Sequence, residues 1–151
     1  MTQEKIELLQ KELCSLQQAA DHLGYSLARC LDLISKEDGS PEQLERLESL
    51  TSRFARLSDL LTQRIFRLMD DLELTGASAL LDRLYRAEKR GWAKATDLIK
   101  IRELRNLIAH EYAADKMHDI FATVAALTPL LLAVVPAVKA YAHSVIQRYP
   151  R

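Results

Sequence analysis

A short segment near the middle of the C-terminal half gathers side chains that can act on a phosphate ester. Over about three helical turns it carries two guanidiniums, an amide, an imidazole and a phenol, at Arg102, Arg105, Asn106, His110 and Tyr112. A guanidinium binds phosphate oxygens through a bidentate fork and keeps its charge near neutral pH. An imidazole can accept or donate a proton near pH 7. These residue types are suited to cleaving a phosphate ester.

RNA is the phosphate ester that needs the fewest catalytic groups, because its own 2′-hydroxyl is the nucleophile and the site need not supply one. One arginine and one histidine can then supply proton transfer and charge stabilisation without a metal ion. Asn106 can hold the His110 tautomer or contact the phosphate. The same residue types are common on solvated helix surfaces, so their spacing alone leaves an ordinary surface face open.

A helix must present these side chains together. At about 100° per residue, they fall within an arc of roughly 160°. The opposite side is apolar and is expected to face the core, with Ile101, Leu104, Leu107 and Ile108.

Apolar residues three or four positions apart predict five helices, at about 2–34, 41–74, 78–90, 96–113 and 116–148. Ser40, Pro41 and Gln43 supply an N-cap, a first-turn proline and a capping-box partner. Thr75-Gly76 is expected to end the second helix, Gly91 the third, and Thr96 or Asp97 to cap the fourth. The last helix is expected to break or bend near Pro129 and Pro136. With no strand alternation and no linker, residues 1–151 predict a single all-α domain, an up-and-down bundle of four to five helices.

The charge balance excludes binding to nucleic acid or anionic lipid through bulk positive charge. The chain has 21 Lys and Arg against 21 Asp and Glu, for a formal net charge of zero. A hydrophobic content of 48% and four glycines favour a globular helical protein over a disordered or all-β one. Any anion site must therefore be a local cluster.

Cysteine usage and targeting signals point to a cytoplasmic protein. Cys14 and Cys30 fall in one predicted helix, roughly 24 Å apart at 1.5 Å per residue, too far for a disulfide. The N-terminus, MTQEKIELLQ, has no apolar signal core, so we expect no export. The uncharged stretch from Ile120 to Val138 approaches the length of a membrane span, but its polar and proline residues favour a buried bundle helix.

The chain lacks the usual signatures of metal and nucleotide binding. It has no HxH or HExxH motif, no Cys/His cluster and no glycine-rich loop. Isolated histidines at positions 22, 118 and 143 are expected at the surface or in packing, and Trp92 is expected to pack the turn after Gly91. We therefore expect no metal site and no cofactor.

Residues 105–112, RNLIAHEY, resemble the Arg-x4-His-x-Tyr motif of the HEPN superfamily, in its HepT-like toxin branch. Residues 53–59, RFARLSD, and 87–91, AEKRG, also resemble HepT-like proteins and the related nucleotidyltransferase substrate-binding-like helical proteins. The resemblance covers most of the chain, from about residue 20 to residue 145.

The resemblance implies a toxin of a toxin–antitoxin pair. In HepT-like toxins the motif arginine and histidine, here Arg105 and His110, form a metal-independent endoribonuclease site. Two chains form a homodimer in which the motif helices face each other across a cleft. The motif tyrosine, here Tyr112, receives AMP from a partner minimal nucleotidyltransferase, the antitoxin, and this modification silences the RNase. Asn106 is then an orienting residue and Arg102 a secondary phosphate contact.

Residues of the second predicted helix can complete the cleft. Arg53 and Arg56 can line it or bind the antitoxin, or can form salt bridges with Asp59, Glu48 or other acidic residues. Asp59 can orient Arg56 or His110. Two other functions stay open: a non-catalytic substrate-binding or scaffold subunit of a two-component nucleotidyltransferase, and a purely structural helical protein.

Overall fold

The computed structural model describes residues 2–34, 39–76, 79–111 and 114–149, except for the side chains of residues 114 and 115, and every regular element in these ranges is a helix. The elements are α1 (Thr2–Cys30), α2 (Pro41–Asp59), the π-helical segment η1 (Leu60–Ile65), α3 (Phe66–Leu72), α4 (Leu80–Lys89), α5 (Ala95–His110) and α6 (Ala114–Gln147). Because α2, η1 and α3 follow without interruption, they form one long rod. The prediction of an all-α chain is confirmed.

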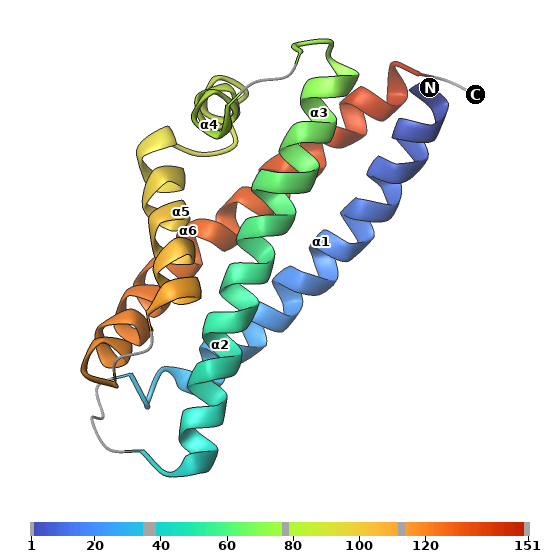
Figure 1. Ribbon diagram of the computed structural model, residues 1–151. Helices are drawn as coiled ribbons and strands as arrows, with labels where there is room; N and C mark the ends of the chain where they lie inside the picture. The colour runs from blue at the N-terminus through green and yellow to red at the C-terminus, as the bar shows by residue number, and fades with distance from the viewer. Residues whose placement is uncertain (1, 35–38, 77–78, 112–113, 150–151) are drawn as a thin grey trace.

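Two long antiparallel helices form the frame of the molecule. In Figure 1, α1 runs beside the continuous α2–η1–α3 rod, and α6 packs against both α1 and α2. The motif helix α5 packs against α2, α4 and α6. The short α4, seen nearly end-on in Figure 1, runs across the other helices and departs from a simple up-and-down pattern.

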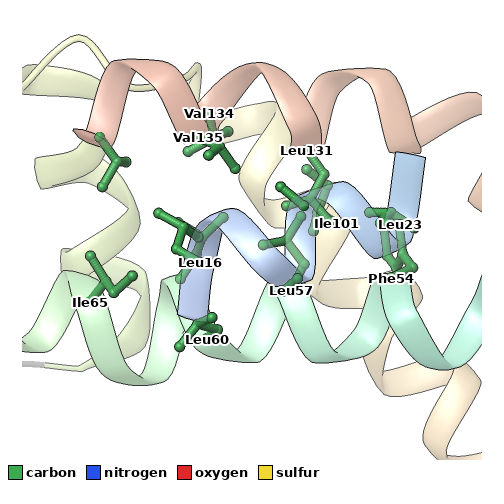
Figure 2. Close-up of a cluster of buried hydrophobic side chains, with 14 of the residues drawn as sticks. Leu16, Leu23, Phe54, Leu57, Leu60, Ile65, Ile101, Leu131, Val134 and Val135 are labelled. Atoms are coloured by element: carbon green, nitrogen blue, oxygen red, sulfur yellow. The ribbon is translucent and has the colours of Figure 1, made fainter. Parts of the chain in front are cut away.

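The core forms where the apolar stripes of these helices meet. Figure 2 shows Leu16 and Leu23 of α1 close to Leu57 of the central rod and to Ile101 of α5. The stripe predicted for the second helix is buried throughout: Leu47, Leu50, Phe54, Leu57, Leu61, Ile65, Leu68 and Leu72. Burial of each such side chain stabilises the fold by about 1.5–3 kcal/mol. Through Ile101 and Leu104, both buried, this core fixes α5 against the rod.

The helix ends agree with prediction where the signal is local. Ser40 Oγ accepts the Gln43 amide N–H at 3.2 Å, and Gln43 Oε1 accepts the Ser40 amide N–H at 3.1 Å, which completes the predicted capping box. Gly91 follows α4 with a left-handed φ of 84°, as a glycine C′ residue requires. Cys14 and Cys30 are free thiols, as predicted.

Other helix ends differ from prediction. The first helix, predicted to reach about residue 34, ends at Cys30, and Leu31 just beyond it is 62% exposed. The cap predicted at Thr96 or Asp97 is wrong, because α5 already begins at Ala95 and Glu88 of α4 accepts the Ala95 amide N–H at 3.1 Å. A side chain from a neighbouring helix thus replaces the local cap.

The last helix continues through both prolines. α6 is helical from Ala114 to Gln147 with Pro129 and Pro136 inside it, so the predicted break is not present. Residues Lys116–Gln147 are long and apolar enough to cross a membrane by length and composition, with a mean hydropathy of 2.2 in the most apolar window. Of that window, 39% is buried inside the bundle.

A buried ionic network ties α3 to α4. The Asp70 side chain, only 5% exposed, accepts hydrogen bonds from Arg86 at 2.7 and 3.1 Å and from Arg90 at 2.8 Å. Burial by itself raises the pKa of Asp70, but the hydrogen bonds from the two guanidiniums bring that pKa below its ordinary value. Trp92 is buried beside this network, with its ring 5.0 Å from Phe66, and packs the turn as predicted.

Candidate active site

The motif arginine is held by a carboxylate from the long rod. Arg105 Nε lies 2.7 Å from Asp59 Oδ1, and Arg105 Nη2 lies 2.9 Å from Asp59 Oδ2. This side-on pairing uses two of the five guanidinium N–H groups and leaves Nη1 without a hydrogen bond to any described residue. The hydrogen bonds to Asp59 raise the pKa of Arg105 above its ordinary value, against a smaller lowering by burial. Arg105 is therefore a permanent cation in a fixed orientation.

Asp59 occupies a special position in the rod. It is the last residue of α2, and the π-helical segment η1 starts at the next residue. Within η1 the Thr62 hydroxyl donates to the Ser58 carbonyl at 2.8 Å, while the Thr62 carbonyl accepts from Arg83 of α4 at 2.7 Å. Single turns of π-helix are frequent at functional sites because they redirect the side chains around them.

The other motif residues lie on the outer side of α5. Asn106 and His110 are exposed, and neither makes a hydrogen bond or ion pair with another described residue. The structure therefore does not join Arg105 to His110 by direct contact, and Asn106 does not hold the imidazole. Tyr112 lies outside the described residues. Leu107, predicted to face the core, is instead 44% exposed on the same outer side.

Arg102 lies one helical turn before Arg105. Its side chain is half-buried, and its Nε is buried with no hydrogen-bond partner among the described residues. A buried donor without an acceptor costs free energy, so this guanidinium is a good candidate for an external anion.

A groove of about 630 Å³ opens between α1 and the rod, next to Asp59. It is lined by Ser15, Gln18, Ala19, His22, Arg56, Asp59, Leu60, Gln63 and Arg64. Arg56 lines this groove, which is not the cleft predicted between two motif helices, whereas Arg53 is turned to α1, where it donates to Ser26 Oγ at 2.7 Å and to the His22 carbonyl at 3.2 Å. Neither arginine forms an ion pair with a described residue. The carboxylate of Asp59 pairs with Arg105, and not with Arg56 or His110.

Two features of the site have no signal in the sequence. The pair between Asp59 and Arg105 joins residues 46 positions apart, and the approach of Arg83 to η1 depends on how α4 crosses the rod. Neither follows from a local pattern. Among the described residues, no three His, Cys, Asp or Glu side chains gather closely enough to hold a metal ion.

Comparisons of the chain with protein-family models, with curated proteins and with solved structures found no match.

Proposed function

We propose that this chain is a metal-independent endoribonuclease of the HEPN type, the toxin of a toxin–antitoxin pair. The fixed guanidinium of Arg105 is the main support, because Asp59 orients it while its Nη1 group stays available for a phosphate oxygen. The side chain is 29% exposed, so a substrate can reach it. The resemblance of residues 105–112 to the HepT-like motif supplies the reaction class.

The reaction is a transfer within the RNA strand. The 2′-oxygen attacks the adjacent phosphorus and loses its proton, the bond from phosphorus to the 5′-oxygen breaks, and that oxygen gains a proton. The products are a 2′,3′-cyclic phosphate and a 5′-hydroxyl. Arg105 anchors the phosphate and stabilises the extra negative charge of the transition state. His110 moves a proton, and Asn106 and Arg102 contact or orient the substrate.

A homodimer would bring a complete set of groups to one cleft. Arg105 is directed toward the rod and His110 toward solvent, so the outer face of α5 can meet the same face of a second chain. The exposed Leu107 provides apolar area on that face.

The proposed partner is a minimal nucleotidyltransferase antitoxin. Attack of the Tyr112 hydroxyl on the α-phosphate of ATP would form a tyrosyl-AMP ester and release pyrophosphate. A bulky anion two residues from His110 would block the cleft and neutralise the field of Arg105. Mass spectrometry after incubation with ATP and the partner should find one or more AMP units on Tyr112 and none on a Tyr112→Phe variant.

Growth arrest tests the proposed function in cells. Expression of the wild-type chain without its partner should arrest growth, whereas Arg105→Ala and His110→Ala should abolish the arrest at equal expression. Full toxicity of both variants would remove the catalytic assignment. A wild-type chain that leaves RNA intact in EDTA at high protein concentration would favour the alternative, a non-catalytic substrate-binding or scaffold subunit.

We also propose that the protein is cytoplasmic. One side of α6 packs into the bundle through residues such as Val124, Leu131 and Val138, all almost fully buried. Burial of this side in the bundle favours a core helix over a helix that spans a bilayer.

A further inference from the structure

Three arginines without carboxylate partners among the described residues lie on α4 and on two helices that pack against it, α3 and α5. They are Arg67 of α3, Arg83 of α4 and Arg102 of α5, and none of them forms an ion pair with a described residue. Contacts of α4 with η1, α3 and α5 bring the three elements together.

One hydrogen bond fixes the central member of this arginine cluster, defined as Arg67, Arg83 and Arg102. Arg83 Nη1 donates to the Thr62 carbonyl at 2.7 Å, which places its guanidinium against η1, and Arg67 follows in the same rod. Arg102 approaches from α5 with a buried Nε that has no acceptor among the described residues. Arg67 is exposed, so the cluster reaches solvent.

The three charges act on one another. Burial lowers the pKa of Arg83 below its ordinary value, and the charge of Arg67 is the next cause, with smaller contributions from Arg86 and Arg102. Asp70 opposes this lowering, but its carboxylate is already bonded to Arg86 and Arg90. The junction therefore holds excess positive charge in a chain with no net charge, together with unused N–H donors.

We propose that Arg67, Arg83 and Arg102 together bind one phosphodiester of the RNA strand. This phosphodiester is the neighbour, along the same strand, of the phosphodiester that Arg105 holds. The proposal rests on the proposed function for the identity of the strand. Arg102 and Arg105 are separated by one helical turn of α5, about 4.5 Å of rise, so neighbouring phosphates of one strand can reach both groups. An oxyanion would accept hydrogen bonds from guanidinium N–H groups that have no acceptor among the described residues, and would relieve the repulsion among the guanidiniums.

The test is the salt dependence of binding to an uncleavable strand. Fluorescence anisotropy would follow a labelled 2′-O-methyl oligoribonucleotide binding to the wild type, Arg67→Gln, Arg83→Gln and the control Arg29→Gln. Arg29 is exposed at the far end of α1, and its charge makes no ion pair with a described residue. Because Arg67 is exposed and forms no hydrogen bond or ion pair with a described residue, its replacement should leave the fold intact, whereas Arg83→Gln also loses the hydrogen bond to the Thr62 carbonyl.

Loss of each phosphate contact should lower the slope of log affinity against log salt by about 0.7 and weaken binding at low salt. The control should match the wild type. A slope in Arg67→Gln and Arg83→Gln equal to that of the control would overturn the proposal, as would a wild type that binds no oligonucleotide. Cleavage of ordinary RNA, measured separately, distinguishes this failure from failure of the RNase assignment, because binding through the cluster does not require catalysis.

Discussion

Arg105 illustrates what a sequence can and cannot reveal about a single residue. Its type and its spacing from His110 predict that it binds phosphate, and these features are local. Its orientation depends on Asp59, which lies 46 positions away on another helix and has several arginines nearer in sequence. Only the packing of α5 on the rod decides that this carboxylate pairs with Arg105 and not with Arg56.

Replacing Asp59 by asparagine should weaken catalysis far more than stability. The asparagine amide is neutral and has one oxygen, so it cannot accept the two guanidinium hydrogen bonds that the carboxylate accepts. We therefore expect Arg105 to be misplaced and the RNA cleavage rate to fall about 10- to 100-fold. The free energy of unfolding should change by less than about 1 kcal/mol, because both partners are about one-third exposed. Asp21→Asn, on an exposed part of α1, serves as the control. Wild-type cleavage by Asp59→Asn would show that the pair does not position Arg105.

At the scale of the element, the apolar stripes predict which segments are helical, and a local cap predicts where the second one begins, although α1 ends at Cys30 and not near residue 34. The rod from Pro41 to Leu72 has such a stripe, and the capping box at Ser40 is that cap. The π-helical segment and the continuation of α6 through its two prolines have no local signal, and the cap on α5 comes from Glu88 of a neighbouring helix. Sequence periodicity does not contain that information.

The end of the rod contains a strained residue. Thr75-Gly76 was the predicted terminator, but α3 ends at Leu72, and Leu74 adopts a left-handed φ of 58° with 89% of its side chain exposed. Leu74→Gly removes the Cβ penalty and loses almost no packing. We expect it to be more stable than Leu74→Ala, which keeps the Cβ, by about 1 kcal/mol in urea unfolding. Equal stability of the two variants would show that Leu74 is not strained.

The buried carboxylate between α3 and α4 should dominate the stability of that junction. Asp70→Asn leaves Arg86 and Arg90 without their charged partner, and we expect a loss of about 3–5 kcal/mol at pH 7. The exposed neighbour Asp71→Asn is the control and should lose little.

The ionic network of Asp70 with Arg86 and Arg90 also predicts that the free energy of unfolding depends on pH. Because the pKa of Asp70 is lower in the folded state than the ordinary value of about 3.9, its stabilisation is complete well above that pH and is lost as the pH falls through the folded pKa. The difference in unfolding free energy between wild type and Asp70→Asn should therefore shrink as the pH falls below the ordinary carboxyl pKa of about 3.9. A difference that stays constant with pH would contradict this assignment.

Over the whole molecule, the 21 basic and 21 acidic residues balance in number, but the positive charge without an ion-pair partner is unevenly distributed. Carboxylates neutralise Arg86, Arg90 and Arg148, whereas the arginine cluster has no such partners among the described residues. RNA binding should consequently be weak, salt-sensitive and confined to one region of the surface. A salt slope that requires many phosphate contacts would contradict this expectation.

The assembly can be tested without detergent. Since one side of α6 belongs to the core and α5 offers an outer face to a second chain, the purified protein should stay in solution and sediment at twice the 17.2 kDa chain mass. A protein that stays in the membrane pellet would show that α6 spans a bilayer. A monomer at micromolar concentration would show that the cleft does not need two chains.

Cleavage of RNA in EDTA, with identification of the product ends, tests the proposed RNase directly. Wild type and the control His143→Ala, which alters an exposed histidine on α6, should yield 2′,3′-cyclic phosphate and 5′-hydroxyl ends at equal rates. Arg105→Ala and His110→Ala should yield none while keeping the helical circular dichroism of the wild type. Intact RNA with the wild type, or undiminished cleavage by either variant, would contradict the assignment of these two residues as the catalytic pair.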